Sequence, residues 1–152
     1  MGRNEKKAYP DAVSRCRLIP LFVAASAWFL FHQVFFIGYV PTGSMEPALK
    51  KGSCLLAEKV GKDYGKGDVI VFRKGGMLLV KRICAAGGET VDVHKTGAAS
   101  GKNGDGRITV PKDCFFVMGD SRENSWDSRY WEEPFVKRED VIGKVIFCRK
   151  GG

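Results

Sequence analysis

Histidine is scarce in this sequence, in which His32 and His94 are the two histidines among 152 residues. Histidine is the usual base that activates a serine nucleophile. His32 lies in a long apolar run and His94 borders a polar, glycine-rich stretch, so neither is well placed to serve as that base. The sequence therefore disfavours a Ser–His hydrolase and directs attention to another base.

Metal-binding cysteine patterns are also lacking. The five cysteines are not paired as CxxC, and none lies near a histidine at ligand spacing, which argues against a zinc site. We expect no metal and no cofactor. Small buried apolar side chains are the simplest role for these cysteines, and one disulfide among the last four stays open in an oxidising compartment. The cysteines are Cys16, Cys54, Cys84, Cys114 and Cys148.

No nucleic-acid motif and no basic helix with interleaved aromatics are present, although 25 Lys and Arg against 17 acidic residues give a net charge of +8. That charge suits nucleic acid, an anionic membrane surface or simple solubility. The missing motif argues against nucleic acid and favours the membrane as the partner.

Long hydrophobic runs are absent except for one. Residues 18–40 are 23 residues without Asp, Glu, Lys or Arg, and a spanning helix needs about 20. Residues 1–17 carry five basic and two acidic side chains. The positive-inside rule then predicts a basic cytoplasmic tail over 1–17, a transmembrane anchor over 18–40 and an extracytoplasmic domain over 41–152. Ala25-Ser26-Ala27 resembles a signal-peptide cleavage site, but the apolar character continues beyond it, which favours a retained anchor.

The remaining chain consists of short apolar or alternating segments separated by glycine and lysine, with no sustained helical periodicity. Lys74-Gly75-Gly76 between two such segments predicts a hairpin, and residues 95–106 read as a polar surface loop. We predict a mostly β protein, with a compact antiparallel domain of about 110 residues after one transmembrane helix. The expected strands cover residues 53–59, 68–73, 77–83, 90–94, 107–110, 114–118 and 141–149.

Two stretches carry candidate chemistry. Ser44 lies between Pro41 and Pro47 and after Gly43, which predicts a stiff turn that fixes the direction of the hydroxyl. Lys81 ends an apolar strand, and burial can lower a lysine pKa far enough for the amine to act as a base. A plain serine-containing loop and a protective edge-strand lysine remain the alternatives.

Residues 119–131 form a third stretch, dense in charges and turn formers, directly after an apolar strand. Asp127 is positioned to pair with Arg129 or Arg82, and the hydroxyls of this stretch, including Ser125, are candidates to orient a buried amine. A solvated loop of mixed charge is the alternative.

Together these stretches resemble the bacterial type I signal peptidases, which are membrane-bound Ser/Lys proteases. The matching segments are residues 41–47, 67–72, 80–82 and 119–131, in the order of the family and after an anchor. Glu132 stands where the family often has glycine, and residues 85–89 depart from the family's Gly-x-Pro-Gly-Asp turn.

The resemblance implies that Ser44 is the nucleophile and Lys81 the general base. Thr42 matches the hydroxyl that joins the Ser44 backbone N–H in the oxyanion hole, and Ser125 matches the serine that orients the lysine. The resemblance also implies a structural salt-bridge cluster of Arg82, Asp127 and Arg129.

This reading predicts a cell-membrane serine endopeptidase that cleaves signal peptides from exported preproteins after small A-x-A residues. Its expected partners are preprotein signal peptides, the lipid bilayer and the secretion translocon, with no nucleic acid. The pocket is expected to be lined by Val40, Met45 and Val80. Three aromatic residues are candidates to face the bilayer, with at least one of them buried in the core: Trp126, Tyr130 and Trp131.

Three alternatives remain. A dedicated peptidase that matures a pilin or another single exported substrate would share every motif. A self-cleaving Ser/Lys repressor would carry a DNA-binding helical region in place of the anchor. A tethered, non-enzymatic β-domain would leave the combination of Ser44, Lys81 and Ser125 unexplained.

Overall fold

The computed structural model describes residues 12–61, 63–92 and 106–149. The chain divides into two compact units, the first ending at Gln33 and the second beginning at Val34. The first unit contains helix α1, which runs from Ala12 to Val34 with Pro20 inside it. Its start precedes the expected position at residue 18 by six residues.

The apolar residues 18–40 do not form the single uninterrupted helix that the sequence predicts, because the helix ends at Val34. Strand β1, Phe35–Tyr39, follows α1 and pairs antiparallel with β2, Cys54–Glu58. Aromatic and β-branched residues favour strands, and β1 alternates in exposure, with Ile37 and Tyr39 exposed. In the three described parts of the chain, no helix combines the length and the apolar character needed to cross a membrane.

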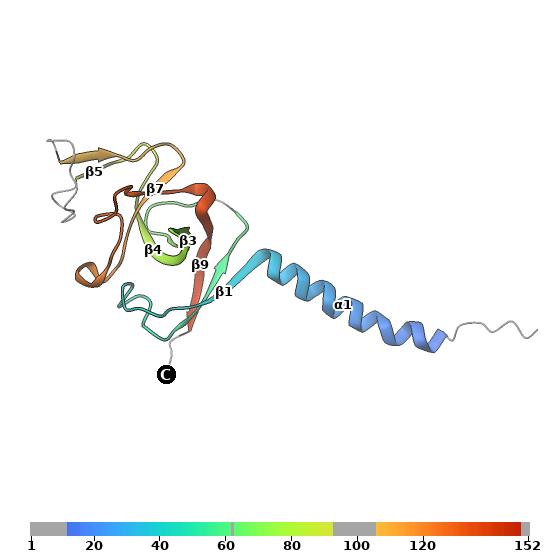
Figure 1. Ribbon diagram of the computed structural model, residues 1–152. Coiled ribbons are helices and arrows are strands. Elements are labelled where there is room, and N and C mark those ends of the chain that lie inside the picture. The colour runs from blue at the N-terminus through green and yellow to red at the C-terminus, as the bar shows by residue number, and fades with distance from the viewer. Residues whose placement is uncertain (1–11, 62, 93–105, 150–152) are drawn as a thin grey trace, which may run out of the picture. The chain divides into compact units, whose positions relative to one another are not determined.

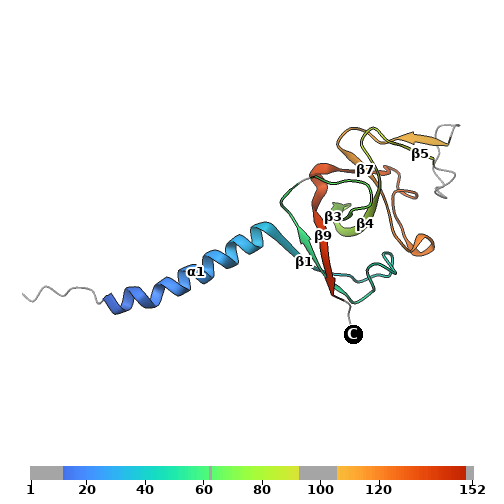
Figure 2. The same ribbon diagram turned by 180° about the vertical axis from the view of Figure 1, so that it is seen from behind.

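The second unit is built on a seven-stranded sheet with the order β1-β2-β9-β3-β4-β7-β8, in which every pairing is antiparallel. This confirms the predicted mostly β, antiparallel domain. A smaller sheet of β5 and β6 lies beyond β7 in both views (Figure 1 and Figure 2). The remaining bounds are β3 Val69–Lys74, β4 Met77–Ala86, β5 Thr90–Asp92, β6 Arg107–Thr109, β7 Cys114–Met118, β8 Phe135–Lys137 and β9 Val141–Arg149, with 3-10 turns at Arg122–Asn124 and Arg138–Asp140.

The predicted hairpin is confirmed between β3 and β4. Gly75 and Gly76 have φ of 57° and 78°, the left-handed region that a two-residue hairpin turn requires and glycine adopts without strain. The register sets Lys74 opposite Met77 and Ile70 opposite Lys81. The turn sequence therefore fixes which face of the sheet receives the Lys81 side chain.

The other strand predictions hold with small changes, except that β1 and the three-residue β8 were not anticipated. Residues 93 and 94 of the predicted 90–94 strand, and all but Gly106 of the predicted 95–106 loop, lie outside the described residues. Cys54, Cys84, Cys114 and Cys148 are free, so the disulfide that the sequence left open does not form among them.

Candidate active site

The turn that carries Ser44 is fixed by buried side chains and backbone bonds. Met45 and Leu49 are buried in the same core cluster as Val40, and the Leu49 N–H donates to the Met45 carbonyl at 2.8 Å. The Val40 N–H donates to the Ser53 carbonyl at 2.9 Å. These contacts hold both sides of the turn, and Ser44 itself is half-buried.

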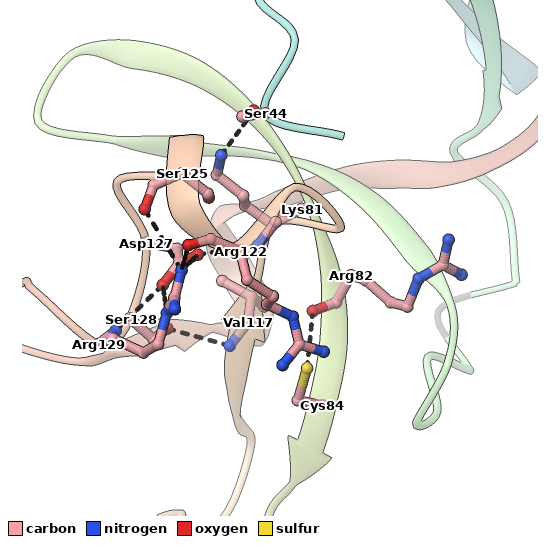
Figure 3. A network of polar contacts seen from close by, with 11 residues as sticks. Ser44, Lys81, Arg82, Cys84, Val117, Arg122, Ser125, Asp127, Ser128 and Arg129 are labelled. Carbon is pink, nitrogen blue, oxygen red and sulfur yellow. Dashed lines mark hydrogen bonds and ion pairs between the residues drawn. The ribbon is translucent and has the colours of Figure 1, made fainter. Parts of the chain in front are cut away.

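Lys81 reaches Ser44 from strand β4. Its side chain is buried, and its Nζ lies 2.8 Å from Ser44 Oγ, within hydrogen-bonding distance (Figure 3). In β4 the buried positions alternate as Lys81, Ile83 and Ala85, so the lysine occupies a core-facing position. The structure thus brings together two residues that are 37 positions apart in the chain.

The surroundings of Lys81 favour its neutral form. Burial lowers the pKa of the Lys81 amine, because removal of water penalises the ammonium form. Asp127 acts in the opposite direction, and the positive charge of Arg129 adds to the lowering. The net shift is downward, toward the range in which an amine can accept a proton from a serine hydroxyl.

Thr42 lies beside the same hydroxyl. Its Oγ1 is 3.3 Å from Ser44 Oγ, and its side chain is exposed. The Ser44 carbonyl accepts a hydrogen bond of 3.1 Å from the Ser121 N–H, which ties the serine turn to the loop after β7. The hydroxyl of Thr42 is therefore within reach of any group bound at Ser44.

Ser125 is buried at the same place, and its Oγ makes no well-formed hydrogen bond among the described residues, although its hydroxyl helps to lower the pKa of Asp127. A buried hydroxyl without a well-formed hydrogen bond calls for an explanation. Gly119 packs directly against it: a Cβ at position 119 would overlap both Ser125 Oγ and the Ser44 carbonyl oxygen. The sequence placed Gly119 directly after an apolar strand, which was a signal for close packing, but no role was predicted for it.

Asp127 and Arg129 form a buried, two-bond ion pair. Arg129 Nε lies 2.8 Å from Asp127 Oδ1 and Arg129 Nη2 lies 3.0 Å from Oδ2. Asp127 Oδ2 also accepts the Gly119 N–H at 2.9 Å. Burial alone would raise the pKa of Asp127, but the bonds from Arg129 and Gly119 outweigh it and the pKa is lowered. The Asp127–Arg129 pair fixes the conformation of the loop over residues 119–131, which lies next to Lys81 (Figure 3).

Arg82 pairs with Asp120 and not with Asp127, the partner considered from the sequence. Its Nη2 and Nε bond Asp120 at 2.6 and 2.8 Å, and its Nη1 donates to the Gly67 carbonyl at 2.7 Å. Arg82 follows Lys81 in the strand, so its side chain points to the opposite face (Figure 3). The loop is therefore held by two ion pairs, Arg82–Asp120 and Arg129–Asp127.

A cavity of about 180 Å³ opens at Ser44 and Lys81. The three residues predicted from sequence, Val40, Met45 and Val80, all line it. Strand β1 adds Phe36, Gly38 and Tyr39, and β4 adds Leu78 and Leu79, none of which is predicted by the sequence. These β1 residues were hidden within the run that we had expected to be helical.

The prediction that at least one of the three aromatic residues of the 119–131 stretch is buried in the core is confirmed. Trp131 is buried in the core with Lys74 Nζ 4.6 Å above its ring, whereas Trp126 and Tyr130 are exposed. Within the described residues, no group of three or more His, Cys, Asp or Glu side chains is arranged to hold a metal ion.

Comparison with known proteins gives one consistent match. The family model described as signal peptidase, peptidase S26, matches residues 15–98 and 95–149. A probable signal peptidase I-2 from Synechocystis sp. is 33% identical over 132 residues, covering 71% of this chain and 60% of the relative. Signal peptidase I of Leptolyngbya laminosa is 32% identical, covering 71% and 65%. Signal peptidase I of Bacillus caldolyticus is 31% identical over 165 residues, covering 88% and 90%. The chain thus spans less than two thirds of the first two relatives.

Proposed function

The chain belongs to the signal peptidase family, peptidase S26, and on that premise we propose that it is a serine endopeptidase that removes signal peptides from exported preproteins. The single observation that carries the proposal is the 2.8 Å contact between Ser44 Oγ and the buried amine of Lys81. A nucleophile beside a base of lowered pKa is the arrangement that serine hydrolysis requires.

The proposed reaction begins with neutral Lys81. Its Nζ lone pair accepts the Ser44 hydroxyl proton as Oγ attacks the carbonyl carbon of the scissile bond. The Thr42 hydroxyl and the Ser44 backbone N–H stabilise the developing oxyanion. Lys81 then gives its proton to the departing amine, and a water molecule, deprotonated by Lys81, hydrolyses the acyl-enzyme.

The buried loop beneath Lys81 is proposed to position the base. The Ser125 hydroxyl is buried and makes no well-formed hydrogen bond within the described chain, which suits a role as a hydrogen-bond partner of the Lys81 amine. The Asp127–Arg129 pair holds this segment through the Gly119 N–H. Arg82 and Asp120 hold the start of the same loop.

The substrate is proposed to bind as an extended strand along β4. Pairing of β4 with β7 begins at Arg82, so the preceding residues Met77–Lys81 pair with β3 on one edge, and β7 does not cover the other. An extended peptide can add to such an edge through main-chain hydrogen bonds, with alternate side chains entering pockets. The small cavity beside the dyad suits small side chains, as in A-x-A cleavage sites.

Ser44→Ala should abolish cleavage of a signal-peptide substrate while the fold remains intact, because it removes the nucleophile alone. The measurement is cleavage of several unrelated preproteins by purified protein, with circular dichroism as the fold control. Cleavage of one substrate only would indicate a dedicated peptidase. Undiminished cleavage by Ser44→Ala would contradict the proposal.

We also propose that the apolar N-terminal segment attaches the enzyme to the membrane, with the second unit on the extracytoplasmic side. A single helix has no core of its own in which to bury residues such as Leu21, Phe22 and Phe29. The basic residues before it set the orientation. The full chain should stay in the membrane pellet after alkaline carbonate extraction, and protease added outside should digest it. Release into the supernatant would contradict attachment, and protection from the protease would contradict the orientation.

A further inference from the structure

The tip of the β3–β4 hairpin has a neighbouring strand on one side only. The first half of β4, residues 77–81, pairs with β3, whereas pairing of β4 with β7 begins at Arg82. A hollow of about 410 Å³ separates the tip from the loop after β7. The hollow is lined by Lys74 and Met77 of the hairpin and by Trp126, Tyr130 and Trp131 of the loop. The tip therefore needs a contact that crosses this space.

Lys74 provides that contact. It is the last residue of β3 and lies opposite Met77 across the turn. Its Nζ donates to the Glu133 carbonyl at 2.9 Å and to the Phe135 carbonyl at 3.1 Å, and it lies 4.6 Å from the centre of the Trp131 ring. An ammonium group has three donor hydrogens and is attracted to the face of an indole. Lys74 thus ties the hairpin to a segment that begins 59 residues later in the chain.

The Lys74 amine is held there although it is partly withdrawn from water. Burial lowers the pKa of Lys74, and the carboxylates of Glu133 and Asp140 oppose that shift. A half-buried charge is costly unless hydrogen bonds compensate it, and the two carbonyls supply such bonds. Arg73, the preceding residue in β3, is exposed and points to the opposite face, so it offers a natural comparison.

The hairpin tip lies along the path proposed for the substrate. The residue at −1 lies at Ser44, and the cavity for small side chains extends from Lys81 back to Leu78 along β4. A strand rises about 3.3 Å per residue, so Met77 lies roughly 13 Å before Lys81. An extended peptide that pairs with this edge therefore brings its residues −4 and −5 beside Leu78 and Met77.

We propose that Lys74 is a positioning residue that holds the uncovered edge of β4 in place for the part of the substrate that precedes −3. The inference rests on the proposed function and adds a residue that acts on substrate binding. The contacts of Lys74 within the described chain go to the segment 131–135 and not to Ser44 or Lys81. Lys74 therefore acts through the β4 backbone on the binding of long substrates, and it leaves the chemical step unchanged.

Lys74→Met tests this role, because it keeps the length of the side chain and removes its charge and its three donors. The substrates are a long peptide that begins at −7 and a short peptide that begins at −3, both with Ala at −1 and −3. The KM of the long peptide should rise by about three- to tenfold, the effect of one or two main-chain hydrogen bonds, with kcat within about twofold of wild type. The KM of the short peptide should not change, because that peptide does not reach Met77.

Two variants and two further measurements serve as controls. Lys74→Arg should restore most of the affinity for the long peptide, because a guanidinium also donates to carbonyls and stacks on an indole ring. Arg73→Met, on the opposite face, should change neither peptide. Fluorescence anisotropy in a Ser44→Ala background separates binding from KM. Without substrate, the amides of residues 77–80 should exchange hydrogen faster in Lys74→Met and at the wild-type rate in Arg73→Met.

An unchanged KM ratio of the two peptides in folded Lys74→Met protein would overturn the positioning role. An equal loss of kcat for both peptides would also overturn it, because the effect would then lie at the dyad. If Lys74→Met fails to fold, Lys74→Gln, which keeps an amide donor, carries the same test with a smaller rise in KM. Wild-type protein that cleaves neither peptide would overturn the proposed function, and the role of Lys74 with it. Wild-type protein that cleaves both peptides but binds them equally well would overturn the role of Lys74 alone.

Discussion

Lys81→Arg should lower kcat/KM by about 10²–10⁴-fold, the range that a positioned general base contributes. The guanidinium keeps the positive charge but cannot be deprotonated in a protein, so it cannot accept the Ser44 proton. Lys81→Met should be equally inactive for the same reason. Because Met has a similar length and no charge to desolvate, that variant should fold at least as well as the wild type.

The pH dependence of kcat/KM in the wild-type enzyme should also test whether Lys81 is the general base. The pKa of Lys81 is lowered by burial, with Asp127 opposing the shift and Arg129 adding to it. Activity requires the neutral amine, so kcat/KM should rise with pH through the lowered pKa and level off below the ordinary lysine value of about 10.4. A stopped assay from pH 5 to 10 measures this.

The free energy of unfolding should also depend on the protonation of Lys81, and it should increase with pH. The unfolded chain holds the Lys81 proton up to about pH 10.4, whereas the folded protein releases it at the lowered pKa. The stabilising contribution of neutral Lys81 to the free energy of unfolding is fully present above pH 10.4, roughly the pKa of lysine in the unfolded chain. It is lost as the pH falls from that value to the lowered pKa of Lys81 in the folded protein. Lys81→Met should remove this slope from the unfolding free energy measured in urea.

The competing reading of Lys81 as a protective edge-strand residue makes different predictions. It expects Arg to be tolerated at position 81 and the rate to be insensitive to either substitution. The burial of the side chain and its 2.8 Å contact with Ser44 argue against that reading. A folded Lys81→Arg enzyme with wild-type kcat/KM would restore it and end the dyad proposal.

The sequence predicted most strands from local chemistry, and the family resemblance led to the prediction that Ser44 and Lys81 lie together, which the 2.8 Å contact between their side chains supports. Ser44 between two prolines and Lys81 at the end of an apolar strand are signals confined to a few residues each, and Gly75-Gly76 defines the hairpin turn. The ion pairs around Ser44 and Lys81 were predicted less completely, because the partner of Arg82 was not identified. The loop over residues 119–131 contains three acidic residues, Asp120, Glu123 and Asp127, and sequence spacing does not decide which of these carboxylates the long Arg82 side chain reaches.

Strand β1 was hidden for a different reason. Phe35–Tyr39 continues an apolar run that is compatible with a helix, and what makes it a strand is pairing with Cys54–Glu58 further along the chain. Periodicity alone does not separate a short apolar strand from the end of an apolar helix. The same misassignment concealed Phe36 and Gly38 as cavity-lining residues, and Val40, the last residue of the predicted anchor, was the one residue of that segment predicted to line the pocket.

Gly119→Ala should be among the most damaging single-methyl additions available in this chain. A Cβ at this position would overlap Ser125 Oγ and the Ser44 carbonyl oxygen, and it would lie 2.5 Å from Ser125 Cβ. Ser125 Oγ could rotate away, but Ser125 Cβ and the Ser44 carbonyl oxygen could not, so the serine turn or the loop itself must move. Overpacking of this kind costs about 1–3 kcal/mol of stability.

The larger effect should be on the rate. The Ser44 carbonyl is held by the Ser121 N–H at 3.1 Å, and displacement of this carbonyl shifts the nucleophile relative to Lys81. A misplacement of about 1 Å can cost on the order of 10²-fold in rate. We expect kcat to fall by that amount with a smaller change in KM, because the cavity walls on β1 and β4 are not touched.

Gly65→Ala is the matched control, since a Cβ there would meet no atom within 4 Å and no left-handed backbone angle is involved. Its stability should stay within about 0.5 kcal/mol of wild type. In the Gly119→Ala background, Ser125→Gly removes one of the two overlapping groups and should recover part of the lost unfolding free energy. It should not recover the rate, because the Ser44 carbonyl remains displaced and the Ser125 hydroxyl is gone. Wild-type stability and kcat in Gly119→Ala would show that the loop and the serine turn do not pack as the structure places them.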